Sequence, residues 1–74
     1  VEIDLIIERP GLKRALVEIK STERATEDDV RSLERLGKDI PNSEALCFTC
    51  DPIPKKIGRV SCFHWQRGLT EIGL

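Results

Sequence analysis

Hydrophobic and polar residues alternate along the start of the chain in the manner of two β-strands joined by a tight turn. The segments VEIDLII and ALVEIKS are rich in Val, Ile and Leu, as is typical of strands that are covered on at least one face. Between them lies Pro10-Gly11, a favourable turn dipeptide, because proline pre-sets φ and glycine adopts conformations closed to other residues. The pattern predicts an antiparallel hairpin over residues 1–21.

The register of this hairpin brings two acidic residues together. We expect Glu8 to lie opposite Arg14, since this pairing forms a favourable cross-strand ion pair beside the turn. The same register places Asp4 opposite Glu18, and two facing carboxylates repel each other unless a positive charge lies between them. Lys20 is one such charge. A divalent cation is a better one, because Mg²⁺ is commonly held by one or two carboxylates plus water.

One amphipathic helix is predicted to follow, ending near Asp39. Thr26 is its expected N-cap because acidic residues fill the turn after it, and Gly37 and Pro41 stand at the other end. An apolar stripe recurs at helical spacing at Val30, Leu33, Leu36 and Ile40. On the solvated face we expect two ion pairs between residues four apart, Glu27 with Arg31 and Glu34 with Lys38.

Two more strands are predicted at residues 44–50 and 60–65. A loop is expected over residues 55–58, and a terminal helical turn or a fraying tail after residue 65. The order strand, helix, strand predicts a right-handed crossover, so residues 44–50 are expected to run parallel to the second arm of the hairpin. The predicted fold class is therefore α/β, a small mixed sheet built from an antiparallel hairpin, a crossover helix and a parallel strand.

The acidic residues of the hairpin carry a family resemblance. Asp4, then thirteen residues, then Glu18-Ile19-Lys20 resembles the D…(D/E)-x-K signature of the PD-(D/E)XK nuclease-like superfamily. More narrowly, EIDLIIE…LVEIKST, a helix, a strand and a terminal segment with tryptophan resemble the nuclease-like domain at the C-terminus of a group of prokaryotic AAA+-type ATPases of unclear function. The similarity covers most of the chain. It implies a partial restriction-endonuclease-like core, and in that superfamily a helix and a strand precede the strand that carries the aspartate. We therefore expect residues 1–74 to form a single nuclease-like domain that is an excised piece or a reduced core.

The resemblance implies a metal-dependent nuclease-like domain that acts on DNA phosphodiesters, a hydrolase of the Mg²⁺-dependent endonuclease type. Asp4 and Glu18 would hold Mg²⁺ or Mn²⁺ together with the carbonyl oxygen of Ile19, and Lys20 would orient a water or neutralise the phosphate. The alternative is a non-catalytic appendage of an ATPase that binds nucleic acid or a protein partner. On spacing alone, plain surface charges explain these residues equally well. Glu2 is a further carboxylate on this face, and a cross-strand partner for Lys20 is its expected role.

The cysteines and the single histidine suggest a weaker alternative, a zinc-stabilised interaction domain. Cys47-x-x-Cys50 followed by Cys62-x-His64 supplies four ligands of the kind that zinc prefers. Because Cys47 and Cys50 are three apart in a predicted strand, their side chains are expected on opposite faces, which argues against this site. We expect cysteines that act as small buried hydrophobic residues.

Basic and aromatic residues offer contacts for nucleic acid but have simpler explanations. Lys55, Lys56 and Arg59 cluster in a predicted loop and, like the basic residues of the helix (Arg31, Arg35 and Lys38), are expected to solvate the surface or to meet phosphates. Trp65 is able to stack on a base. In a chain with two Phe and no Tyr, we expect it to be a core anchor instead.

Composition narrows the class of protein. The chain has 74 residues, of which 34% are charged and 39% hydrophobic, and this predicts a single soluble globular domain. The formal net charge of -1 provides no global positive field that would attract nucleic acid, so a nuclease function must depend on local geometry and a metal.

No apolar run approaches the roughly 20 residues of a membrane span, so no membrane partner is expected. Three cysteines cannot all pair within the chain, which favours a reducing, cytoplasmic setting. An open sheet edge would favour a homodimer or an upstream ATPase domain as the partner.

Overall fold

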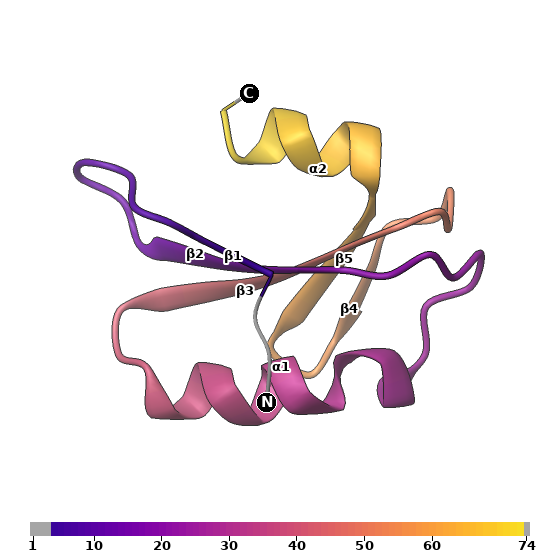
Figure 1. The fold of residues 1–74 in the computed structure, drawn as a ribbon, viewed down its shortest axis with the longest axis horizontal. Helices are drawn as coiled ribbons and strands as arrows, with labels where there is room; N and C mark the ends of the chain where they lie inside the picture. The colour runs from indigo at the N-terminus through magenta and orange to yellow at the C-terminus, as the bar shows by residue number, and fades with distance from the viewer. Residues whose placement is uncertain (1–3, 74) are drawn as a thin grey trace.

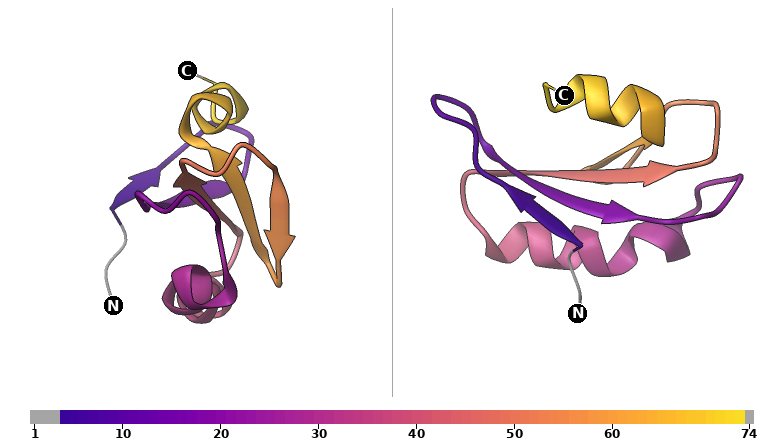
Figure 2. Two further views of the ribbon diagram at one scale, coloured as in Figure 1. Left: turned by 90° about the vertical axis from the view of Figure 1, so that its right-hand side faces the viewer. Right: turned by 45° about the horizontal axis from the view of Figure 1, so that its top comes forward.

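The computed structural model describes residues 4–73, and there it shows a five-stranded mixed sheet between two helices (Figures 1 and 2). The strands are β1 (Leu5–Ile7), β2 (Arg14–Ile19), β3 (Ser43–Thr49), β4 (Lys55–Ile57) and β5 (Val60–His64), in the spatial order β1-β2-β3-β5-β4. β1 with β2 and β4 with β5 are antiparallel, whereas β3 runs parallel to both β2 and β5. The predicted α/β class and the mixed sheet are confirmed.

The turn of the β1–β2 hairpin follows from its proline and glycine. The backbone N–H of Leu12 donates to the carbonyl oxygen of Arg9 at 3.1 Å, which closes a four-residue turn around Pro10 and Gly11. Gly11 has φ +75°, the left-handed conformation that the third position of a type II turn requires. The guanidinium of Arg9 also donates to the carbonyl oxygen of Lys13, at 2.6 Å from its terminal nitrogen. The turn is thereby held by both backbone and side chain.

The hairpin has the predicted register. Ile6 lies opposite Leu16, and the pairs on either side of it are Leu5 with Val17 and Ile7 with Ala15. The guanidinium of Arg14 lies 2.9 Å from the carboxylate of Glu8, which is the expected ion pair. Both side chains are solvent-accessible, so this pair selects the register more than it stabilises the fold.

Helix α1 (Glu27–Asp39) begins and ends within a residue of the predicted bounds. The Asp29 carboxylate accepts hydrogen bonds from the backbone N–H of Thr26 at 2.8 Å and from its hydroxyl at 3.1 Å. The Asp29 carboxylate thereby supplies its half of the capping box that a threonine N-cap with an acid three residues later predicts. Val30 and Leu33 of the apolar stripe are buried against the sheet.

The ion pairs predicted along the exposed face of α1 were wrong. Arg31 pairs with Asp28, three residues earlier, at 2.6 Å. Glu34 does not pair with Lys38 among the described residues, and its carboxylate accepts a hydrogen bond from the backbone N–H of Arg59 at 2.6 Å. An unpaired N–H in a tight turn competes well against an exposed lysine, because a surface ion pair contributes little. Glu34 therefore connects α1 to the β4–β5 turn.

The capping box gives a first prediction. Asp29→Ala is expected to lower the free energy of unfolding by about 1 kcal/mol, since the N-cap backbone N–H loses its acceptor. Asp28→Ala is the matched control, because it removes an acid from the same turn and the same helix dipole without touching the cap. Urea denaturation measures both. Equal losses in the two variants would show that helix-dipole electrostatics, and not the capping box, stabilises this end.

Each face of the sheet is covered by one helix, and each interface has its own core (Figure 2). The core beneath α1 comprises Leu16, Ala25, Val30, Leu33, Ala45, Cys47, Val60 and Cys62. The core beneath α2 (Trp65–Glu71) comprises Ala15, Val17, Leu46, Phe48 and Ile72. β3 supplies both cores, which matches its central place in the sheet. Within residues 4–73, neither helix has the length and apolar character that crossing a bilayer requires.

The C-terminal third of the chain differs from the prediction in two ways. Residues 55–57, expected as a loop, form strand β4, which pairs with β5 around Gly58 at φ +60°.

Trp65 is not a core anchor, because α2 begins at this residue and leaves its side chain 45% exposed. The strand ends at His64, whose Nδ1 accepts a hydrogen bond from the backbone N–H of Gln66 and so caps the helix. Phe48, at 2% exposure, is a buried aromatic residue of the core beneath α2.

Candidate functional site

The parallel strands β2, β3 and β5 all end on one side of the sheet, the side from which the chain enters α1 (Figure 1). In open α/β sheets ligands bind outside the carboxyl ends of such strands. Six polar residues gather at or next to this end: Asp4, Glu18, Lys20, Thr49, Asp51 and Lys55. This end of the sheet contains all three residues that the sequence nominated as catalytic.

Glu18 lies on β2 opposite Cys47 of β3. It shares the face of Leu16, which packs beneath α1, and its side chain is only 12% exposed. One carboxylate oxygen, Oε1, lies 3.3 Å from Nζ of Lys20. The other, Oε2, is buried and has no hydrogen-bond partner among the described residues. A buried carboxylate oxygen without a donor is costly, so this atom has unused capacity to bind a donor or a cation.

Asp4 lies where the hairpin ladder stops. β1 begins at Leu5, and beyond it the backbone N–H of Ile19 donates to the Asp4 carboxylate at 2.7 Å. Because the N–H and C=O of one strand residue point to the same side, the carbonyl oxygen of Ile19 also faces the side of Asp4. Asp4 therefore contacts the backbone of Ile19, the last residue of β2, and Lys20 pairs with the neighbouring Glu18.

The predicted ligand set has two carboxylates and one carbonyl oxygen. Within residues 4–73, no three His, Cys, Asp or Glu side chains are grouped closely enough to hold a metal ion. Glu2, the other carboxylate that the sequence suggested, lies outside the described residues. Two carboxylates suit Mg²⁺, which keeps several waters, better than they suit metals that need a complete protein cage.

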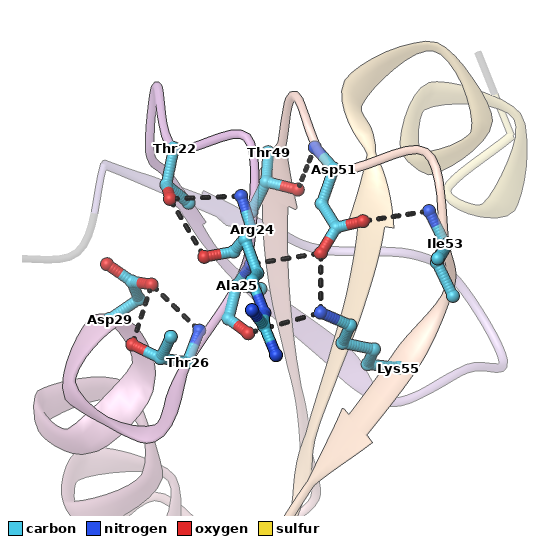
Figure 3. A network of polar contacts seen from close by, with 9 residues as sticks. All are labelled: Thr22, Arg24, Ala25, Thr26, Asp29, Thr49, Asp51, Ile53 and Lys55. Carbon is cyan, nitrogen blue, oxygen red and sulfur yellow. Dashed lines mark hydrogen bonds and ion pairs between the residues drawn. The ribbon is translucent and has the colours of Figure 1, made fainter.

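A second polar cluster adjoins this one and was not predicted (Figure 3). Asp51, two residues beyond the end of β3, is buried, and its carboxylate lies 2.7 Å from Nζ of Lys55. The same carboxylate accepts backbone N–H groups from Ala25 at 3.0 Å and from Ile53 at 2.9 Å. The Thr49 hydroxyl accepts the N–H of Asp51 itself at 3.0 Å. Asp51 thus connects three segments: the start of α1, the β3–β4 loop and β4.

These contacts determine the ionisation of Asp51. The hydrogen bond from Lys55, followed by those from the backbone N–H groups of Ile53 and Ala25, lowers the pKa of its carboxyl to about 2. Every oxygen of this carboxylate is occupied, so Asp51 holds the structure and is not a free ligand. The signal in the sequence was present, since an aspartate directly after a buried parallel strand marks the carboxyl edge of a sheet.

The cysteines form no site of their own within the described residues. Cys47 is buried within β3, whereas Cys50 comes after the end of the strand and is exposed. Cys47 lies opposite Cys62 in the β3–β5 ladder, and both are buried beneath α1. The hydrogen bond with Cys62, burial, and the nearby Glu18 carboxylate raise the pKa of the Cys47 thiol. Cys47 is therefore a small, protonated core residue beside Glu18.

Comparisons with protein-family models, with curated proteins and with solved structures find no match for this chain. A function for this chain must therefore be inferred from its own residues and their geometry.

Proposed function

We propose that this domain is a metal-dependent nuclease-like domain that acts on phosphodiesters of DNA. Asp4 and Glu18 would be the ligands of Mg²⁺ or Mn²⁺, joined by the carbonyl oxygen of Ile19, and Lys20 would act on the phosphate. The PD-(D/E)XK resemblance of these residues supports the proposal. A position at the carboxyl ends of parallel strands supports it independently.

The observation that carries the proposal is the buried Oε2 of Glu18, which has no hydrogen-bond partner within residues 4–73. Lys20 pairs with the other oxygen of this carboxylate, and Oε2 lies beside the apolar core under α1 without a donor from the described part of the chain. A cation is the natural partner for such an atom. The donor set is made of hard oxygens, which fits Mg²⁺ or Mn²⁺ and does not fit a soft metal.

The chain's own residues would have distinct tasks in this reaction. A bound Mg²⁺ would act as a Lewis acid on the phosphoryl oxygen and lower the pKa of an attacking water. Asp4, held by the N–H of Ile19, is fixed in place before any ligand arrives. Lys20 lies within reach of Glu18, and its ammonium would face the charge that develops on the phosphate.

The test combines metal binding with catalysis. Titration of Mn²⁺ by calorimetry should show one site in the native protein, and affinity should fall at least about tenfold in Asp4→Asn or Glu18→Gln. A plasmid-nicking assay with Mg²⁺ should show activity that Glu18→Gln and Lys20→Met both abolish. Asp28→Asn is the matched control, since that exposed acid lies in the first turn of α1 and, among the residues that the structure describes, pairs with Arg31 alone. Equal Mn²⁺ affinity in Asp28→Asn and Glu18→Gln would refute the site.

One observation favours a second function, a non-catalytic appendage that binds nucleic acid or a protein partner. Lys20 already forms an ion pair with Glu18, and Asp4 is already engaged by the backbone of Ile19. All three side chains thus have structural tasks that need no metal. Under this alternative the native protein nicks no plasmid at any Mg²⁺ concentration, and Glu18→Gln leaves its ligand affinity unchanged.

A further inference from the structure

The opposite end of the sheet holds a groove that the candidate site does not use. It has a volume of about 570 Å³ and crosses the amino ends of the parallel strands. Three of its lining residues are basic: Lys13 precedes β2, Lys56 belongs to β4, and Arg59 is in the β4–β5 turn. The hydroxyl-bearing residues Ser43 and Ser61 lie between them. The groove is therefore polar and open, with positive charges supplied from separate segments of the chain.

One carboxylate, that of Glu34, lies beside these three residues, because it accepts a hydrogen bond from the backbone N–H of Arg59 at 2.6 Å. Among the described residues, no carboxylate lies within ion-pair distance of the side chains of Lys13, Lys56 or Arg59. The one acid in the lining, Glu44, is engaged by Arg9 at 3.0 Å. Three cations against the single nearby carboxylate of Glu34 still leave a local excess of positive charge at the groove, in a chain with a net charge of -1.

We propose that this groove binds the phosphate backbone of a nucleic-acid strand. The cations come from three segments spread across the sheet, which suits a ligand whose negative charge is repeated along its length. Long lysine and arginine side chains with free ammonium and guanidinium groups contact phosphates without reading sequence. The contact would hold a strand at the end of the domain opposite Glu18, and it does not require that the domain cut the strand.

The experiment measures binding of a fluorescein-labelled single-stranded DNA by anisotropy, in EDTA, across a range of salt concentrations. EDTA removes any contribution from a metal at Glu18, so the result is independent of the nuclease proposal. Lys56→Ala combined with Arg59→Ala should weaken binding at low salt at least about tenfold. It should also reduce the slope of log K against log salt by roughly 1.4, about 0.7 for each cation removed. Adding Lys13→Ala should reduce the slope further.

The matched control removes the same charge elsewhere. Arg31→Ala combined with Arg67→Ala deletes two arginines that already pair with acids on the outer faces of α1 and α2. The proposal requires that this control bind DNA with the native slope. It would be overturned if both double variants lost affinity equally, or if the native protein showed no salt-dependent binding. Displacement of the DNA by inorganic phosphate at matched ionic strength would also overturn it, since the groove would then hold a single phosphate.

Discussion

Asp51→Asn is expected to lower the melting temperature at neutral pH by on the order of 10 °C, as the loss of one partner of a buried ion pair does in a small domain. The Asp51 side chain is 5% exposed and its carboxylate joins Lys55 to the start of α1 and to the β3–β4 loop (Figure 3). Asparagine keeps one acceptor but leaves the Lys55 ammonium beside a neutral amide. Thermal unfolding followed by circular dichroism measures the effect.

The same substitution has a defined pH dependence. Folding lowers the pKa of the Asp51 carboxyl from 3.8 to about 2, so the folded state favours the ionised form. The stabilisation is fully present above about pH 4 and is lost as the pH falls through about 2. The difference in melting temperature between the native protein and Asp51→Asn should therefore be constant from neutral pH down to about 4, and shrink below it. Using the difference removes the contribution of the other carboxylates that titrate in the same range.

Asp28→Asn is the control for this prediction, because its carboxylate also pairs with a cation but is 81% exposed. It should change the melting temperature by no more than a few degrees. Replacing both partners, as Asp51→Asn with Lys55→Met, should recover part of the loss, since neither charge is then left alone. A melting temperature for Asp51→Asn equal to that of Asp28→Asn at neutral pH would contradict the role assigned to Asp51.

The parts of this fold that depend on local chemistry were predictable from the sequence. The hairpin register follows from two short-range constraints, the Pro10-Gly11 turn and the Glu8–Arg14 pair, and the structure has it. Helix α1 is defined by its capping box and its apolar stripe, both of which are present. The contact of Asp4 with Ile19 and the pairing of Lys20 with Glu18 follow from the same register and from the alternation of side chains along a strand.

The parts that the sequence did not reveal depend on contacts distant along the chain. β4 is short and polar, and it is a strand only because β5 pairs with it. Trp65 is exposed because α2 starts directly after β5, a boundary that composition does not mark. Asp51 is important because its carboxylate reaches Ala25, 26 residues earlier in the sequence. In each case a tertiary partner, absent from any local window, determines the outcome.

These distant contacts also support the candidate site. The chain that leaves β2 after Lys20 is held by the N–H of Cys50, which donates to the carbonyl oxygen of Thr22 at 2.9 Å. A few residues on, the Asp51 carboxylate holds Ala25 at 3.0 Å. Both contacts come from the segment that follows β3. The position of Lys20 beside Glu18 thus depends on residues that no nuclease motif includes.

The second large effect is expected at Gly68 of α2. A Cβ added there would lie 2.5 Å from two ring carbons of Phe48, a side chain that is only 2% exposed. The ring is enclosed by the core beneath α2 and has no room to move, so the helix itself must shift. Gly68→Ala should therefore lower the free energy of unfolding by about 1–3 kcal/mol, in spite of the helix propensity that alanine adds.

Gly37→Ala is the matched control, a glycine-to-alanine change within the other helix. A Cβ at Gly37 meets the Cβ of Ala45 at an ordinary contact distance of 3.7 Å. Because alanine has the higher helix propensity, Gly37→Ala should raise the free energy of unfolding by up to about 1 kcal/mol. Urea denaturation followed by the fluorescence of Trp65, the first residue of α2, reports global unfolding and also any earlier release of this helix. The decisive comparison places Gly68→Ala in a Phe48→Leu background, where the smaller side chain makes room and most of the penalty should disappear. If the penalty at Gly68 is the same with leucine as with phenylalanine at position 48, contact with the aromatic ring is not its cause.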